Sequence, residues 1–141
     1  MRKETVHATC VAIEGRAVLI AGPSGSGKSD LALRLIDRGA ALVSDDYTEL
    51  TAEKGRLLAS PPERIAGKIE VRGVGIVGRE WTSAVPVCLI VDLSAPVERL
   101  PEAATMAVAG VVLPSLGLAA LEASAPIKVE AALNLLGLEA S

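Results

Sequence analysis

The chain has 141 residues, a length typical of one domain, and we expect residues 1–141 to form a single unit with its own hydrophobic core. Half of the residues are hydrophobic and 22% are charged, which excludes a disordered chain. The net charge of −3 and the presence of only one Trp, one Tyr and no Phe argue against a nucleic-acid-binding protein, because such proteins combine basic surfaces with aromatic platforms for bases.

Membrane insertion and secretion are also disfavoured. No run of about 18 apolar residues is present, and the N-terminal residues lack the apolar segment of a secretion signal. Cys10 and Cys88 lie in apolar runs without the spacing of metal ligands, so we expect buried free thiols. These features predict a cytoplasmic protein that binds no membrane.

The first third of the chain alternates predicted strands with one predicted helix. Residues 5–14 alternate apolar and polar side chains, which predicts a strand, and a short turn leads to a second strand over residues 17–21. The apolar spacing of residues 29–38 predicts a helix packed on a sheet, and residues 40–44 read as a short buried strand.

The remaining elements are predicted from turn residues and apolar runs. They are a hairpin over residues 48–59 with its turn at Gly55, a glycine-rich loop over residues 67–78, a central strand over residues 85–93, a connector over residues 97–100, a segment over residues 103–113 that fits helix or strand, and a helix over residues 125–136. Strands alternating with helices predict an α/β fold, and the hairpins make its sheet mixed.

The turn between the strand at 17–21 and the helix at 29–38 matches the phosphate-binding P-loop pattern G-x-x-x-x-G-K-S/T. It consists of Gly22, Pro23, Ser24, Gly25, Ser26, Gly27, Lys28 and Ser29. Glycines let successive backbone N–H groups turn toward phosphate oxygens, and the next helix points its positive end at the same anion. We expect Lys28 to bridge phosphates and Ser29 to bind Mg²⁺. The sequence therefore predicts a nucleoside-triphosphate site in an α/β P-loop domain whose mixed β-sheet is flanked by helices.

Two aspartates, Asp45 and Asp46, follow the short strand at 40–44. Carboxylates at a strand end can support the metal of a P-loop enzyme or accept a proton from a hydroxyl group. Neighbouring residues of a strand point to opposite sides, so only one of the two needs to face the site. A solvated turn explains the pair equally well on spacing alone.

Asp92 ends the apolar strand at 85–93, as the metal-binding carboxylate of many P-loop proteins does. We favour a simpler interpretation, a core strand that ends in a capping aspartate.

Four stretches occur in the order found in one enzyme family. They are Val6-His7-Ala8, Gly22-Pro-Ser-Gly-Ser-Gly-Lys-Ser-Asp30, Leu42-Val-Ser-Asp-Asp46 and Ile69-Glu-Val-Arg-Gly-Val-Gly-Ile76. With them, the chain resembles the catalytic domain of HPr kinase/phosphorylase, a P-loop enzyme that phosphorylates a serine of the phosphocarrier protein HPr. The resemblance implies a P-loop kinase-like domain with a mixed β-sheet flanked by helices, and the chain reads as this domain without the family's N-terminal domain.

The resemblance implies roles for individual residues. Lys28 would contact the phosphates of ATP, and Ser29 and Glu70 would bind Mg²⁺. Asp45 would accept the proton of the target serine, and His7 would lie close to that aspartate. Arg99 corresponds more loosely to an arginine of the family.

The resemblance also implies an activity, a partner and an assembly. The activity would be Mg²⁺- and ATP-dependent phosphorylation of a serine of HPr or an HPr-like protein, and this phosphorylation would regulate the phosphotransferase system. The protein would form a homo-oligomer, which in family members is a hexamer. Residues 100–127 contain no Lys or Arg, whereas the family has arginines tied to dephosphorylation there. We therefore expect the reverse, phosphorylase reaction to be weak.

Two other functions remain open. A small-molecule kinase of the shikimate or nucleoside-monophosphate type also begins with a P-loop, but it needs an arginine-rich lid, which residues 100–126 do not supply. A nucleotide-binding regulatory module without turnover would not need Lys28, Ser29, Asp45 and Glu70 together.

Overall fold

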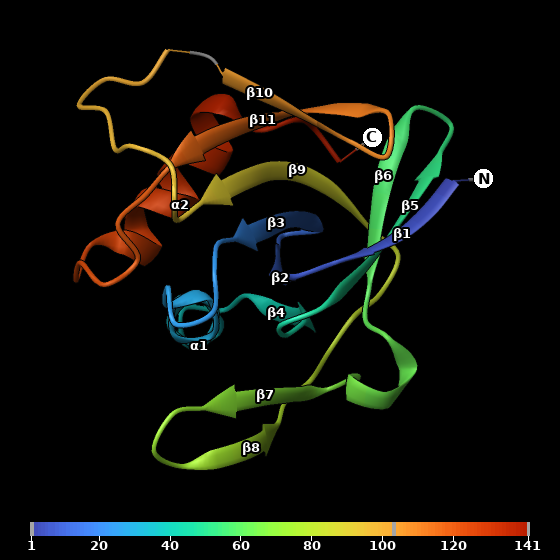
Figure 1. Ribbon diagram of the computed structural model, residues 1–141, viewed down its shortest axis with the longest axis vertical. Coiled ribbons are helices and arrows are strands. Elements are labelled where there is room, and N and C mark those ends of the chain that lie inside the picture. The colour runs from blue at the N-terminus through green and yellow to red at the C-terminus, as the bar shows by residue number, and fades with distance from the viewer. Residues whose placement is uncertain (1, 103, 141) are drawn as a thin grey trace.

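The computed structural model describes residues 2–102 and 104–140 and has a curled mixed sheet at its centre (Figure 1). Its nine strands run in the order β1-β5-β6-β9-β3-β2-β4, with β11 added beside β9 and β10 beside β11. These strands are β1 (Arg2–Val6), β2 (Ala8–Ile13), β3 (Arg16–Ala21), β4 (Ala41–Ser44), β5 (Thr48–Glu53), β6 (Arg56–Ser60), β9 (Val85–Asp92), β10 (Ala104–Val108) and β11 (Val111–Gly117). The predicted mixed α/β fold is confirmed.

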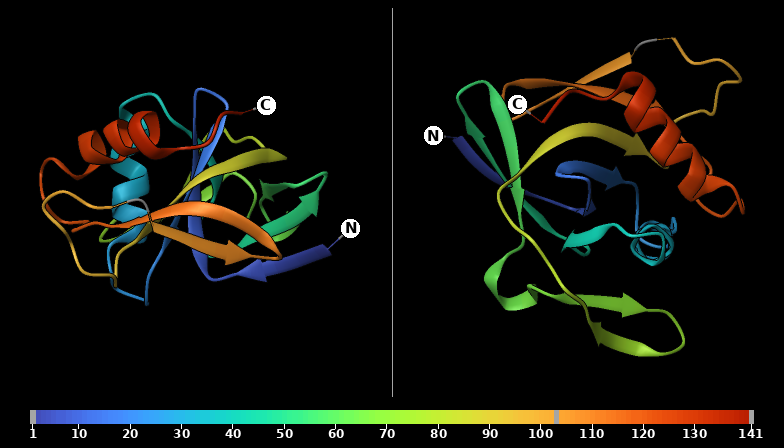
Figure 2. Two further views of the ribbon diagram at one scale, coloured as in Figure 1. Left: turned by 90° about the horizontal axis from the view of Figure 1, so that it is seen from above. Right: turned by 180° about the vertical axis from the view of Figure 1, so that it is seen from behind.

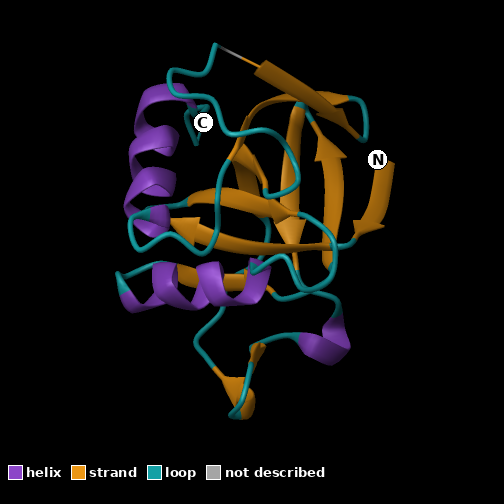
Figure 3. Cartoon of the chain, turned by 60° about the vertical axis from the view of Figure 1, so that its left-hand side comes forward, coloured by secondary structure: helices purple, strands orange, loops and turns teal. Residues whose placement is uncertain are grey.

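Three further elements cover or extend the sheet. Helices α1 (Lys28–Asp37) and α2 (Ala125–Leu136) lie on the same side of it, as Figure 3 shows. A separate hairpin, β7 (Lys68–Val71) with β8 (Gly75–Gly78), follows a 3-10 turn at Glu63–Ile65 and extends away from the main sheet (Figure 2, right). None of the helices in the described residues is long and apolar enough to cross a membrane.

Strand β9 organises the sheet because it is apolar along almost its whole length. One edge of β9 pairs in parallel with β3. Its other edge pairs with β6 near the start of the strand and with β11 near the end. Parallel pairing makes β3 and β9 end on the same side of the sheet, which is where the loop from β3 to α1 begins. Ligands of open α/β sheets bind at this side.

Alternation along the strands divides the buried side chains into two clusters. In β3, Val18 and Ile20 face the two helices, whereas Ala17 and Leu19 face the second cluster with residues of β5, β6 and β11. The helices therefore cover one face, and the curl of the sheet closes the other. Arg38, at the C-terminal end of α1, forms an ion pair of 2.8 Å with Glu130 in the middle of α2.

We predicted one continuous strand over residues 5–14, and this was wrong, because the segment contains the end of β1 and the whole of β2. The chain bends at His7 because β1 pairs with β5, whereas β2 pairs with β3 and β4. A change of partners cannot be read from an alternating pattern. Because His7 lies at this bend, it belongs to neither pair of strands.

The predicted glycine-rich loop over residues 67–78 is also wrong, because this segment is the β7–β8 hairpin. Gly73 takes a left-handed conformation (φ 83°) in its turn, and the N–H of Val74 bonds to the carbonyl of Val71. The alternation of Ile69 and Val71 is a strand pattern that the glycines obscured.

The other elements agree with the sequence to within a few residues. The hairpin turning at Gly55, the central strand, the exposed connector at 97–100 and the last helix are confirmed. The ambiguous segment is a hairpin of β10 and β11, apart from Ala103, which lies outside the described residues, as do Met1 and Ser141.

Both cysteines are buried and free, as predicted. Burial raises the pKa of the Cys10 thiol far above its ordinary value, and burial is also the main cause of the raised pKa of Cys88. Desolvation disfavours the thiolate, so neither side chain is suited to nucleophilic chemistry at neutral pH.

Candidate active site

The predicted P-loop has the strand–loop–helix setting that its motif requires. It leaves β3 after Ala21 and enters α1 at Lys28. Gly25 (φ 82°) and Gly27 (φ 97°) take left-handed conformations that favour glycine. At Gly22, an added Cβ atom would lie 2.7 Å from the Oγ of Ser26, so the loop closes tightly only without that atom.

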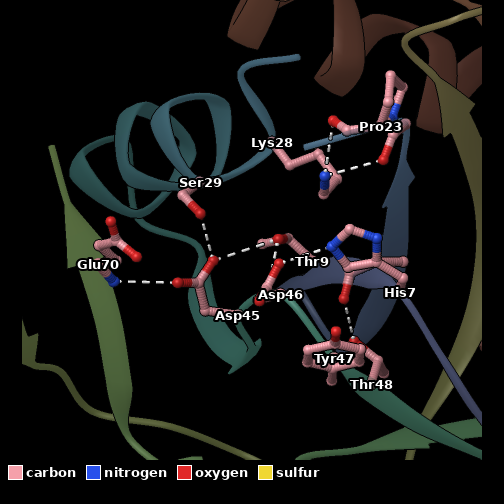
Figure 4. Close-up of polar contacts among 12 residues, drawn as sticks. His7, Thr9, Pro23, Lys28, Ser29, Asp45, Asp46, Tyr47, Thr48 and Glu70 are labelled. Carbon is pink, nitrogen blue, oxygen red and sulfur yellow. Dashed lines mark hydrogen bonds and ion pairs between the residues drawn. The ribbon is translucent and has the colours of Figure 1, made fainter. Parts of the chain in front are cut away.

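The polar groups of this loop suit an anion. The buried ammonium of Lys28 donates hydrogen bonds to the carbonyl oxygens of Gly22 (2.8 Å) and Pro23 (3.0 Å), which hold it inside the loop (Figure 4). The Oγ of Ser26 is buried and has no hydrogen-bond partner among the described residues. A buried unpaired hydroxyl is costly, and a phosphate oxygen would satisfy it.

Asp45 connects the P-loop helix to two strands. The carboxylate is buried, with 7% of the residue exposed. Its Oδ1 accepts hydrogen bonds from the hydroxyls of Ser29 (2.5 Å) and Thr9 (3.2 Å), and its Oδ2 accepts one from the backbone N–H of Glu70 (3.0 Å). Figure 4 shows this carboxylate between the three groups. Both carboxylate oxygens of Asp45 are thus already hydrogen-bonded, one of them to the hydroxyl of the P-loop serine.

Asp46 points the other way, and its exposed side chain (57%) accepts a hydrogen bond of 2.8 Å from the Nε2 of His7. The resemblance implied that His7 lies close to Asp45, and the structure shows its hydrogen bond on the neighbouring aspartate, Asp46. The reason is the left-handed conformation of Asp46 (φ 67°), where the N–H of Tyr47 bonds back to the carbonyl of Asp45 across a tight turn. The turn directs Asp46 outward, to the bend between β1 and β2 that carries His7.

Thr9 was missed by the sequence analysis. Its hydroxyl donates to Asp45 and accepts from the backbone N–H of Asp46 (3.1 Å), so one buried side chain fixes both aspartates. In the sequence, Thr9 stands out only as a polar residue within an otherwise apolar strand. Threonines with a purely structural role show the same pattern, so it does not identify a functional residue.

Part of the P-loop, both aspartates and Glu70 line one cavity of about 570 Å³. Its lining comprises Ser24, Gly25, Gly27, Lys28, Ser29, Asp30, Leu33, Asp45, Asp46, Glu70, Val71, Arg72 and Leu121. Four of these side chains are carboxylates and two are cations, Lys28 and Arg72. A triphosphate would therefore meet a surplus of negative charge unless a divalent cation accompanied it.

The donor set suits Mg²⁺ only together with other ligands. No group of three or more His, Cys, Asp or Glu in the described part of the chain can hold a metal ion by itself. Mg²⁺ typically keeps several waters and binds one or two carboxylates plus substrate phosphates. The hydroxyl of Ser29, beside the carboxylates of Asp45 and Glu70 in one cavity, fits this requirement.

The apolar wall of the cavity was not predicted. Arg34 of α1 donates to the carbonyl oxygens of Ala120 and Glu122 and so holds the turn between them. This turn places Leu121, which is 78% exposed, against the P-loop, where a Cβ atom at Gly27 would lie 3.3 Å from its Cδ2. An aliphatic side chain thus forms this wall, within the segment 100–127 that contains no Lys or Arg.

Two residues considered in the sequence analysis, Arg99 and Asp92, are not among the residues that line this cavity. Arg99 is exposed in the connector between β9 and β10 and is not among the lining residues. Asp92 accepts hydrogen bonds from the N–H (2.9 Å) and the hydroxyl (2.7 Å) of Ser94, which is the capping role that we favoured.

Comparison with known proteins agrees with this geometry. The family model of the HPr Serine kinase C-terminal domain matches residues 1–81. HPr kinase/phosphorylase of Clostridium botulinum is 43% identical over 72 residues, and that of a Geobacillus species is 48% identical over 73 residues; each match covers 51% of this chain and 24% of the relative. The chain thus spans about a quarter of the length of these curated relatives.

A solved structure matches almost the whole chain. The Hpr(Ser) kinase/phosphatase from Coxiella burnetii superimposes with a TM-score of 0.83 at 29% sequence identity, covering 94% of this chain and 95% of that one. The family match includes His7, the P-loop, the aspartate pair and Glu70. This chain therefore belongs to the HPr Serine kinase C-terminal domain family.

Proposed function

We propose that this protein is a Mg²⁺- and ATP-dependent serine kinase that acts on HPr or an HPr-like phosphocarrier protein. One observation supports this proposal above all others: the exposed Asp46, bonded to His7, lies on the wall of the cavity that the P-loop also lines. A proton acceptor at the rim of a phosphate site, open to solvent, suits a hydroxyl group presented by another protein.

In this proposal the P-loop binds the triphosphate of ATP. Its backbone N–H groups and the N-terminus of α1 face the phosphates, and Lys28 exchanges the carbonyls of Gly22 and Pro23 for phosphate oxygens. When bound, Mg²⁺ neutralises phosphate charge in a cavity that is rich in carboxylates. Ser29 and Glu70 hold it, with Asp45 behind the serine hydroxyl.

The geometry favours a different division of roles between the aspartates from the one implied by the resemblance. Asp45 already accepts three hydrogen bonds and is buried. Asp46 is exposed, and its side chain has one partner in the described part of the chain, His7, whose imidazole can orient the carboxylate and share the transferred proton. We therefore propose Asp46 as the proton acceptor and Asp45 as the residue that positions the metal-binding serine.

Other parts of the proposal rest on family membership alone. They are regulation of the phosphotransferase system, a cytoplasmic location, assembly as a homo-oligomer such as a hexamer, and a role for Arg99. If Arg99 acts, it does so on the partner protein or a neighbouring copy, because it lies outside the lining of the cavity.

Transfer of radiolabel from ATP to a panel of acceptors tests the proposed function. The panel contains HPr, HPr with its target serine replaced by alanine, shikimate and nucleoside monophosphates, each with Mg²⁺ and with EDTA. We expect label on intact HPr alone and only with Mg²⁺. Label on a small molecule would instead identify a small-molecule kinase, and ATP binding without any transfer would identify a regulatory module.

The reverse reaction, attack of inorganic phosphate on phosphoserine, should be slower than forward transfer by at least about tenfold, the cost of one missing charge-assisted contact. Residues 100–127 supply no cation, and Leu121 lines the cavity instead. Phosphate-dependent release of pyrophosphate from phosphorylated HPr measures this rate. The variant Leu121→Arg should raise the reverse rate more than the forward rate. Equal forward and reverse rates in the unmodified protein would contradict the prediction.

A further inference from the structure

His7 is the only histidine of the chain, and two side chains from one short turn contact it. Its Nε2 bonds to Asp46, and its ring lies against that of Tyr47, with ring centroids 5.1 Å apart and planes inclined by 30°. Figure 4 shows the tyrosine ring beneath the imidazole. Tyr47 is half exposed (48%), and it does not line the cavity. Nothing in its position alone suggests a role in core packing.

The backbone of Tyr47 is held by hydrogen bonds at both its N–H and its carbonyl group. Its N–H donates to the carbonyl of Asp45 at 2.7 Å, and its carbonyl accepts a hydrogen bond from the hydroxyl of Ser44. The ring therefore projects from the same turn that directs Asp46 outward. A left-handed aspartate held by bonds on both sides is strain of the kind found at functional sites.

His7, in contrast, has little else to fix its ring. It lies at the bend between β1 and β2, outside both strands, and its side chain is partly exposed. One hydrogen bond leaves an imidazole free to rotate out of line, whereas a stacked aromatic partner restricts the plane of the ring. The stack with Tyr47 is the second constraint, and it comes from the residue next to the proposed proton acceptor.

We propose that Tyr47 is a positioning residue that holds the His7 imidazole, by stacking, in the orientation that aligns Nε2 with Asp46. This inference rests on the proposed function of the Asp46–His7 pair. It predicts that the aromatic ring matters and the hydroxyl does not, because none of the hydrogen bonds found among residues 2–102 and 104–140 involves the phenol oxygen of Tyr47. Phenylalanine should therefore replace tyrosine, and leucine should not.

The first test needs no catalysis. The NMR signal of the Cε1 proton of the single histidine is unambiguous and senses the ring current of a stacked neighbour. Tyr47→Leu should shift this signal toward the position of a free imidazole, while Tyr47→Phe should leave it close to that of the unmodified protein. The control is Trp81→Leu, which removes the other aromatic ring, 50% exposed, and should leave the signal in place. An unchanged signal in Tyr47→Leu would overturn the inference.

The second test uses transfer from ATP to HPr. Tyr47→Leu should lower kcat by about threefold to tenfold, the range expected when a stacking contact is lost, with the KM for ATP changed by less than about twofold. Tyr47→Phe should restore kcat. If Tyr47→Leu raised the KM for HPr at unchanged kcat, Tyr47 would be a docking contact and the positioning role would be refuted.

The two tests separate the failure of this inference from the failure of the proposed function. If the unmodified protein transferred no phosphate to HPr, the proposed function would be wrong, and the positioning role would fall with it even though the NMR measurement could still detect the stack. If the unmodified protein is active and Tyr47→Leu shifts the histidine signal without lowering kcat, the stack exists but does not serve transfer, and only the present inference fails.

Discussion

Lys28→Ala should abolish phosphoryl transfer to HPr, with a loss of at least about 10²–10³-fold in kcat, and should weaken binding of Mg²⁺·ATP. The ammonium is buried at the end of the P-loop, so its charge acts on the phosphates with little screening by water. Among the described residues that line the cavity, Arg72 is the one other cation, against four carboxylates. Removing Lys28 therefore leaves the developing negative charge with Arg72 and the metal.

Radiolabel transfer and calorimetric titration with ATP measure the two effects separately. Lys28→Ala also leaves the carbonyls of Gly22 and Pro23 without their donor, so a melting curve must show that the variant is folded. Lys54→Ala, in the exposed turn between β5 and β6, is the matched control and should behave like the unmodified protein. A folded Lys28→Ala variant with near-normal turnover would show that the P-loop does not serve catalysis.

The P-loop could be predicted because everything it needs is local in sequence. Strand, glycines and helix follow one another within residues 16–37, and their conformations depend on residue types that the motif itself contains. The hairpin at Gly55 was predictable for the same reason. The β7–β8 hairpin was missed because its glycines, which serve a turn at Gly73, outweighed the alternation of Ile69 and Val71.

The partners of the aspartates could not be predicted, because they depend on the arrangement of distant strands. His7 reaches Asp46 only because the chain bends where β1 leaves β5 and β2 joins β3. The outward direction of Asp46 depends on a positive φ angle, which cannot be predicted from two adjacent aspartates in the sequence. The family motifs assigned Asp45 to the site, and the folded chain adds that Asp45 bonds to the P-loop hydroxyl, whereas Asp46 faces solvent and bonds to His7.

This difference makes the aspartate pair the most informative place to mutate. Asp46→Asn should lower transfer by about 10²–10⁴-fold, the usual cost of removing a general base, while Mg²⁺·ATP binds within a few fold of normal. Asparagine has the size of aspartate and tolerates the left-handed conformation found here (φ 67°), so the turn should persist. Its amide cannot accept the serine proton at neutral pH.

Asp45→Asn should fail in a different way. The carboxylate accepts hydrogen bonds from the hydroxyls of Ser29 and Thr9 and from the N–H of Glu70, and an asparagine that keeps its oxygen on this N–H must turn its N–H₂ group toward the hydroxyls. The hydroxyls would then accept where they now donate to a buried carboxylate, so charge-assisted hydrogen bonds are lost, the melting temperature should fall, and the serine hydroxyl should lose its orientation. We therefore expect weaker Mg²⁺-dependent binding of ATP, with the loss of transfer following from it.

The two variants are compared with Asp37→Asn, an exposed aspartate at the end of α1 that should change neither binding nor transfer. Calorimetry with ATP in the presence and absence of Mg²⁺, melting curves and radiolabel transfer distinguish the outcomes. If Asp45→Asn were stable, bound Mg²⁺·ATP normally and transferred no phosphate, while Asp46→Asn remained active, the proton acceptor would be Asp45, as the resemblance implied. Proton transfer would then have to occur at a buried carboxylate 2.5 Å from the Ser29 hydroxyl, and the hydrogen bond between His7 and Asp46 would serve the stability of the turn alone.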